Sequence, residues 1–241
     1  MTRTPEDRRT AIDPVHTVFF DFGGTLVESQ PPTDVWLRVM RGVGVDVNHD
    51  ALAEAIAEAD RRYHPLYYDY KGRMREFWLE NNRLILERLG VRDPEDTLAK
   101  EIDARFMTGE TYRVYPESHD ALESLRRRGF GLGVLSNNTD GLLTILERLG
   151  LARCFDHVTY SQEARAEKPD PAVFRLALER AGCAPAEAVH VGDSYEADVV
   201  GARRVGLTPV LVDRGDRHRE ADCLRIRDLR EVEGLLGGRN F

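Results

Sequence analysis

The chain has 241 residues, of which 41% are hydrophobic and 32% charged, so it is long enough to bury a sizeable core. Its formal net charge of −8 at pH 7 argues against nucleic acid as the main partner, because binding to a phosphate backbone requires concentrated positive charge. No stretch approaches the roughly 20 uncharged apolar residues that span a bilayer, and the first residues lack the apolar segment of a secretory signal. The cysteines, Cys154, Cys183 and Cys223, show no CxxC spacing and predict neither a disulfide framework nor a zinc site. We therefore expect a cytoplasmic protein that does not bind a membrane.

The first half of the chain predicts a tail, one strand and a block of helices. Residues 1–14 are polar and charged without an apolar period, which predicts a loose tail. The run VHTVFFD at 15–21 predicts a buried strand that ends in an acid and enters a glycine-rich turn. Helical patterns then follow at 34–42, 50–66, 73–89 and 94–107, with Asp93 as the expected N-cap of the last and Pro94 at its first position. Helices inserted after the first strand indicate a cap domain over a site, at 30–112.

Strand and helix patterns alternate from there to the end of the chain. Short apolar runs predict strands at 131–137, 157–161, 188–194 and 208–214. Amphipathic segments predict helices at 117–128, 139–149, 171–181 and 194–205, and several of them end at a glycine. This alternation predicts an α/β fold with an open, parallel, Rossmann-like sheet and helices on both faces. The core would comprise 15–29 and 113–241, with the four-helix cap inserted between them.

Polar side chains follow the predicted strands at their carboxyl ends, where open parallel sheets bind ligands. These residues are Asp21 after the first strand, Ser136 and Asn137 after the second, Lys168 after the third, and Asp193 after the fourth, with Asp198 one helical turn later. Converging carboxylates repel one another unless a cation lies between them, and hard oxygen ligands suit Mg²⁺. Ser136, Lys168 and the amides of the glycine-rich turn could bind a phosphate beside that cation. The pattern therefore predicts phosphoryl transfer on a small phosphorylated substrate.

Four segments resemble, in order and spacing, the motifs of the haloacid dehalogenase-like hydrolases: DFGGTL at 21–26, LSNN at 135–138, KPDP at 168–171 and GDSYEAD at 192–198. The helical insert is similar to the cap of the subgroup whose cap follows the first motif. The resemblance implies that Asp21 is the nucleophile and forms an aspartyl phosphate, that Ser136 and Asn137 bind the phosphoryl group, and that Lys168 neutralises it and orients the nucleophile. It also implies that Mg²⁺ is held by the Asp21 carboxylate, the Gly23 carbonyl and Asp193, with Asp198 a ligand through water or a partner of the ligands.

The first motif departs from that of most phosphatases in the family, which carry a second aspartate two residues after the nucleophile as general acid and base. Gly23 occupies this position and cannot protonate a leaving alkoxide, a contribution worth about 10²–10⁴-fold. Three explanations stay open. The leaving group needs little help, as in a glycosyl 1-phosphate, an acyl phosphate or an activated aryl ester. A side chain of the insert acts as the acid, the candidates being His64, Tyr67, Tyr68 and Asp69. Otherwise the enzyme turns over slowly, or the protein binds the phosphorylated ligand without hydrolysing it.

We expect a phosphatase of a small metabolite, as a monomer or homodimer, and three alternatives compete with it. A catalytically impaired protein that keeps the phosphate and metal pocket is favoured by the loss of the second aspartate. Dehalogenases of the family also lack this aspartate, but they need no metal, which would leave Asp193 and Asp198 without a purpose. Phosphonate cleavage, with Lys71 or Lys100 as a Schiff-base amine, is weaker because both lysines suit surface positions. The aromatic residues of 61–78 suit helix packing, and any that faced the site would suit a hydroxylated or aromatic metabolite.

Overall fold

The computed structural model describes residues 15–70, 73–108 and 111–236, and it divides into two compact units. Unit 1 comprises Met1–Glu28, Val114–Asn137 and Leu151–Phe241, and unit 2 comprises Ser29–Arg113 and Asn138–Gly150. Among the described residues, no helix combines the length and the apolar character needed to cross a membrane.

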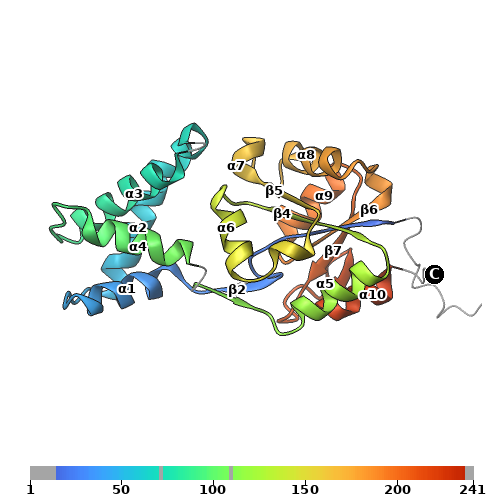
Figure 1. Cartoon of the computed structure of the whole chain (residues 1–241), viewed down its shortest axis with the longest axis horizontal. Coiled ribbons are helices and arrows are strands. Elements are labelled where there is room, and N and C mark those ends of the chain that lie inside the picture. Colours follow the sequence, from blue (N-terminus) through green and yellow to red (C-terminus); the bar gives the residue numbers. More distant parts are fainter. Residues whose placement is uncertain (1–14, 71–72, 109–110, 237–241) are drawn as a thin grey trace, which may run out of the picture. The chain divides into compact units, whose positions relative to one another are not determined.

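Unit 1 is built on a parallel sheet of six strands in the order β5-β4-β1-β6-β7-β8 (Figure 1). The strands are β1 (Thr17–Phe20), β4 (Gly131–Ser136), β5 (His157–Tyr160), β6 (Ala188–Gly192), β7 (Thr208–Val212) and β8 (Leu224–Ile226). All four residues of β1 are buried, as expected of a central strand that is covered on both faces. The predicted parallel α/β sheet is therefore confirmed. The short edge strand β8 was not predicted, because three residues carry too little pattern to distinguish a strand from a loop.

Helices cover both faces of this sheet (Figure 1). Those on one face include α8 (Pro171–Ala181) and α9 (Gly201–Arg204), and those on the other include α5 (Ser118–Arg127) and α10 (Val232–Leu235). A short helix, α7 (Ser161–Ala164), follows β5 directly. The predicted helix at 194–205 is divided into a π-helical segment, η5 (Tyr195–Val200), and α9. Such π-helical turns are frequent at functional sites, and this one carries Asp198.

Unit 2 is helical. It contains α1 (Pro32–Gly42), α2 (His49–Tyr63), the 3₁₀ segment η2 (His64–Tyr70), α3 (Met74–Arg88), α4 (Thr97–Met107) and α6 (Gly141–Arg148). Its core is an apolar cluster that includes Trp36, Leu52, Ile85 and Ile102. Where the chain passes between the units, β2 (Val27–Ser29) and β3 (Tyr112–Val114) pair as a two-stranded sheet.

Two predicted helix boundaries were wrong. The helix predicted to begin at Pro94 begins at Thr97, after Asp96 in the left-handed conformation at φ 58°. Asp93 nevertheless caps it from upstream, because its Oδ2 accepts a hydrogen bond of 2.9 Å from the first-turn amide of Ala99. The helix predicted at 50–66 ends at Tyr63, shortly before Pro65, which has no N–H for a helical hydrogen bond.

Candidate active site

Asp21 follows the central strand of the sheet and stands at the start of the glycine-rich turn. Its amide donates to the carbonyl of Val191 at 2.9 Å, which extends the pairing of β1 with β6 by one residue. The turn closes through a hydrogen bond of 2.7 Å from the amide of Gly24 to the carbonyl of Val27. The Asp21 carboxylate accepts from the amide of Phe22 and is buried, with an exposed fraction of 8%. Burial raises the pKa of this carboxyl, although the Lys168 ammonium opposes the rise.

Lys168 is the cation of the site and is almost fully buried. Its ammonium donates to Asp21 Oδ1 and Asp198 Oδ1 at 2.7 Å each and to the carbonyl of Leu135 at 3.1 Å, so all three protons are used. Burial lowers the pKa of Lys168, but the charges of Asp198 and Asp21 outweigh that effect and raise it above its ordinary value. Lys168 is therefore held as a cation between two acids.

Asn137 fastens the loop that carries Lys168 to the end of β4. Its amide nitrogen donates to the Lys168 carbonyl at 3.1 Å, and its amide oxygen accepts from the Lys168 amide at 2.7 Å. These two bonds hold the backbone of the loop, so the structure favours a positioning role for Asn137. Its predicted contact with substrate stays a prediction.

Asp198 has both carboxylate oxygens engaged within the protein. Oδ1 is shared between Lys168 and His190 Nε2, the latter at 2.8 Å, and Oδ2 accepts from the amide of Ser194 at 3.0 Å. Burial raises the pKa of Asp198, but the neighbouring Lys168 and His190 lower it well below its ordinary value. Asp198 therefore anchors Lys168 rather than offering free oxygens.

Asp193 lies directly after β6 and is less buried than Asp21 and Asp198. One oxygen from each of these three carboxylates lies within 4.8 Å of the other two. Burial, followed by the charges of Asp21 and Asp198, raises the pKa of Asp193 to about 6. The glycine at position 24 is required by this arrangement, because a Cβ there would lie 2.2 Å from Asp193 Oδ2.

The structure thus brings the three predicted acids and Lys168 together. Three carboxylates face one ammonium, and this excess of negative charge together with hard oxygen donors fits a divalent cation such as Mg²⁺. Gly23 pairs with Val27 through its backbone and has no side chain to act as an acid.

Ser136 is the last residue of β4, next to β1 in the sheet, and is 4% exposed. Its hydroxyl has no hydrogen-bond partner among the residues that the structure describes, so it can bind a further group. A small polar side chain at a strand terminus next to Asp21 fits the predicted contact with a phosphoryl group.

Two residues of unit 1 that support the site were missed by the sequence analysis. His190, fully buried on β6, hydrogen-bonds Asp198 and packs edge-on against Phe174, with 5.3 Å between ring centroids. Arg214, after β7, donates to the carbonyl of Thr25 at 2.9 Å and to Glu117, and its guanidinium lies 3.6 Å from the ring centroid of Tyr115. A signal existed for Arg214, which follows a strand at its carboxyl end like the predicted site residues.

The candidates for an acid in the helical insert lie in η2, within unit 2. Tyr67 packs edge-on against Phe77 and stacks with His64, so it takes part in helix packing. The side chain of Tyr68 and the whole of Lys71 lie outside the described residues. Lys100 is exposed and donates to the carbonyl of Glu95 at 2.9 Å.

Comparisons with known proteins identify the family of the chain. The family model "Hydrolase: haloacid dehalogenase-like hydrolase" matches residues 15–206. The chain is 33% identical over 200 residues to haloacid dehalogenase-like hydrolase domain-containing protein 3 of Bos taurus, which covers 80% of each chain. It is 32% identical over 216 residues to a glyceraldehyde 3-phosphate phosphatase of Methanopyrus kandleri, covering 83% of this chain and 85% of that protein. A 2-haloacid dehalogenase structure from Pseudomonas syringae superposes with a TM-score of 0.72 at 27% identity, over 92% of this chain and 98% of the other.

The chain therefore belongs to the haloacid dehalogenase-like hydrolases, and it is a hydrolase. The predicted family and fold class are confirmed.

Proposed function

We propose that the chain is a Mg²⁺-dependent phosphatase of small phosphorylated metabolites, with Asp21 as the nucleophile. The observation that carries this proposal is the buried Lys168 ammonium, 2.7 Å from both Asp21 and Asp198, with Asp193 within reach of the same point. The similarity to a glyceraldehyde 3-phosphate phosphatase supports the same class of reaction.

Each residue has a separate role in this proposal. Asp21 attacks phosphorus, forming an aspartyl phosphate while the bond to the leaving oxygen breaks, and water then hydrolyses that intermediate. Ser136 donates its hydroxyl to the phosphoryl group, and Lys168 fixes the nucleophile and offsets the added charge. Asp21, Asp193 and the Gly23 carbonyl would hold Mg²⁺, which supplies electrostatic stabilisation of the transferring group. Asp198 acts through Lys168, because its own oxygens are already bonded.

The absence of a side chain at Gly23 limits the substrates. Without a general acid there, esters of poor leaving groups lose a contribution of about 10²–10⁴-fold unless another group donates the proton. If no side chain of unit 2 donates this proton, acyl phosphates and activated esters are the favoured substrates. Unit 2 would serve as the cap that excludes water during phosphoryl transfer.

Dehalogenation is the second candidate, because Gly23 and the similarity to a 2-haloacid dehalogenase favour it. The acid cluster favours phosphatase activity over it, since carbon–halogen cleavage would leave Asp193 without a partner cation.

The two candidates are tested by assaying the full chain with acetyl phosphate and p-nitrophenyl phosphate in Mg²⁺, and with 2-chloropropionate. We expect phosphate release and an acid-stable phosphoryl group on Asp21, both abolished by Asp21→Asn and preserved in the exposed control Asp120→Asn. Chloride release without phosphate release would support the dehalogenase. Tight phosphate binding without turnover or phosphoryl-enzyme would support the impaired protein instead.

A further inference from the structure

Arg214 joins three segments of unit 1 beside the turn that follows β1. Its guanidinium donates to the Thr25 carbonyl at 2.9 Å and to the Glu117 carboxylate, and it lies 3.6 Å from the ring centroid of Tyr115. Thr25 and Glu117 are both buried, so water competes little for these two hydrogen bonds. The proposed chemistry gives these contacts no role so far.

The bond to Thr25 fixes a peptide group of the turn. The Thr25 carbonyl and the Leu26 amide belong to one planar peptide group. The Leu26 amide donates to the Phe22 carbonyl at 2.9 Å, which helps to close the turn. Arg214 bonds the oxygen of this group and Phe22 bonds its N–H, so the orientation of the group is set at both ends.

The segment of Tyr115 holds the next carbonyl of the turn. The Tyr115 amide donates to the Leu26 carbonyl at 3.1 Å, and the Ser118 hydroxyl donates to the same oxygen at 2.8 Å. The Tyr115 ring is also the surface on which the guanidinium lies, and a cation is attracted to the face of an aromatic ring. Two consecutive carbonyls of the turn are thus held by residues outside it, one by Arg214 and one by the segment of Tyr115.

The direction of the Gly23 carbonyl depends on the same turn. The peptide group between Gly23 and Gly24 is trans, so its C=O and N–H point in opposite directions. Its N–H donates to the Val27 carbonyl at 2.7 Å, while the Gly23 oxygen accepts no hydrogen bond among the described residues. Asp193 lies beside this group, because a Cβ on Gly24 would be 2.2 Å from Asp193 Oδ2. An oriented carbonyl and a neighbouring carboxylate are hard oxygen donors of the kind that Mg²⁺ prefers.

We propose that Arg214 is a positioning residue for the divalent cation. By holding the Thr25 carbonyl, Arg214 keeps the turn in the conformation that directs the Gly23 carbonyl to the cation. The inference rests on the proposed function, in which Mg²⁺ lies at the acid cluster. The guanidinium is itself positive, so its charge alone opposes the binding of a cation. Removing Arg214 therefore weakens Mg²⁺ binding if positioning decides the outcome, and strengthens it if charge does.

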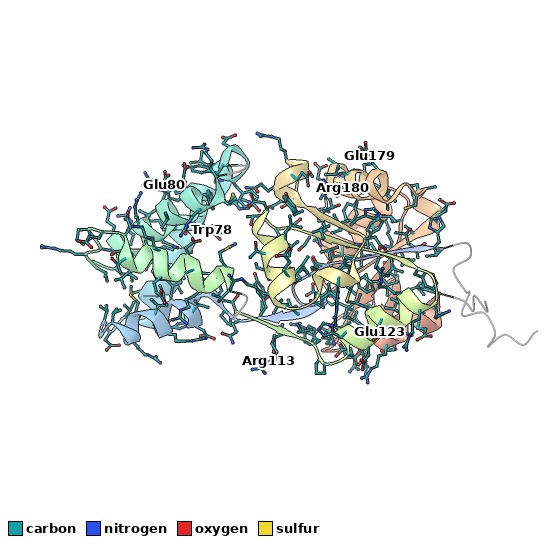
Figure 2. All side chains as sticks on the ribbon, in the orientation of Figure 1. Trp78, Glu80, Arg113, Glu123, Glu179 and Arg180 are labelled. Carbon is teal, nitrogen blue, oxygen red and sulfur yellow. The ribbon has the colours of Figure 1, made fainter. Side chains whose placement is uncertain are left out.

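The test measures the dissociation constant of Mg²⁺ for the full chain by isothermal titration calorimetry, without substrate. We expect Arg214→Met to weaken Mg²⁺ binding about 5–10-fold, a part of the value of one hydrogen bond from a charged donor. The matched control is Arg180→Met. Arg180, on α8 and labelled in Figure 2, makes the same pair of bonds, to the Val158 carbonyl at 2.7 Å and to the Glu163 carboxylate. This control should lower the unfolding temperature and leave the dissociation constant of Mg²⁺ unchanged.

Two uncharged changes test positioning without altering the charge of the site. Tyr115→Leu removes the ring beside the guanidinium and should weaken Mg²⁺ binding about threefold. Tyr115→Phe keeps the ring and should bind Mg²⁺ as the unaltered chain does. Thermal unfolding without Mg²⁺ confirms that each variant is folded, and this pair carries the test if Arg214→Met does not fold.

Failure of this inference can be told apart from failure of the proposed function. If the unaltered chain binds Mg²⁺ and Arg214→Met binds it equally or more tightly, the positioning role is overturned and the cation site stands. An equal weakening in Arg180→Met would also overturn the positioning role, because a general loss of stability would then explain both variants. Mg²⁺ binding that is absent from the unaltered chain, or that survives Asp193→Asn, would overturn the proposed cation site together with this inference.

Discussion

Lys168 is the residue whose removal would most disturb the charge balance of unit 1. Its ammonium is the cation that bonds Asp21 and Asp198, and both partners are buried. Replacing a buried cation leaves its partners uncompensated, which typically costs about 3–5 kcal/mol. We therefore expect Lys168 to contribute to folding and, under the proposed function, to the chemistry.

We predict that Lys168→Met lowers the free energy of unfolding by about 3 kcal/mol and reduces phosphatase turnover at least a hundredfold. Urea unfolding and hydrolysis of acetyl phosphate measure the two effects. Lys100→Met is the matched control, because that ammonium is exposed and bonds a carbonyl, and it should change neither quantity. An unaltered stability in Lys168→Met would contradict the ion-pair account.

Under the proposed function His190 is a positioning residue, since its Nε2 hydrogen-bonds Asp198, which in turn bonds Lys168. We predict that His190→Leu lowers kcat about tenfold with little change in KM, because Asp198 then holds Lys168 less firmly. His190→Gln, which keeps a hydrogen-bonding group, should recover part of kcat. His49→Gln changes an exposed histidine and serves as the control. A merely structural role for His190 would lower stability in both variants without the partial recovery of kcat.

At the scale of the element, the turn after β1 is shaped by a glycine that approaches an acid closely. Gly24 has φ +73°, where a side chain is strained, and a Cβ at this position would lie 2.2 Å from Asp193 Oδ2. Gly182 has a similar φ of +61° at the end of α8, but no atom lies within 4 Å of its Cβ position. A residue with a Cβ would therefore meet similar backbone strain at either position, and the two positions differ only in the contact.

This pair allows strain and displacement to be measured separately. We predict that Gly24→Ala and Gly182→Ala each lose about 1–2 kcal/mol of stability from the left-handed backbone. Only Gly24→Ala should also lose at least tenfold in kcat/KM, because the new methyl group displaces Asp193. Thermal unfolding measures the stability of each variant, and hydrolysis of acetyl phosphate measures its activity. Equal loss of activity in both variants would contradict displacement of Asp193 as the cause.

The sequence predicted the elements of unit 1 well because their signals are local. Short β-branched runs flanked by glycine identify buried strands, and the polar residue after each run is placed by the parallel sheet. The convergence of Asp21, Lys168 and Asp193 could be predicted for this reason. The start of α4 could not, since Asp93 caps it from six residues before Ala99 rather than from the adjacent position.

Contacts between elements that are distant in sequence could not be predicted in this way. A histidine within an apolar strand carries no signal that it will meet Asp198, and this contact arises only when η5 packs over β6. A cavity of unit 2 that Asn81 and Asp103 line likewise requires several of its helices to be placed together. Packing of side chains across elements, rather than periodicity along one element, decides these features.

At the scale of the whole molecule, the acid cluster links stability to pH and, under the proposed function, to a bound cation. Asp193 has a pKa of about 6 in the folded protein against an ordinary value of 3.8, so the folded state binds a proton that the unfolded chain has lost between these values. Stability contributed by this group therefore falls as pH rises through that window. Asp198 acts in the opposite direction, because its lowered pKa stabilises the fold above its ordinary range.

A cation that requires an ionised Asp193 should reverse the loss that this acid causes at higher pH. We predict that Mg²⁺ raises the unfolding temperature clearly near pH 7.5 and only slightly near pH 5, where the proton competes for the carboxylate. Chelation with EDTA should remove the increase. Asp193→Asn, which cannot ionise, should show little effect of Mg²⁺ at either pH, while the exposed control Asp120→Asn should behave as the unaltered chain. If Mg²⁺ stabilised the chain equally at both pH values, or stabilised Asp193→Asn as well, then the cation would bind elsewhere, because competition with the Asp193 proton follows directly from the placement of the three acids.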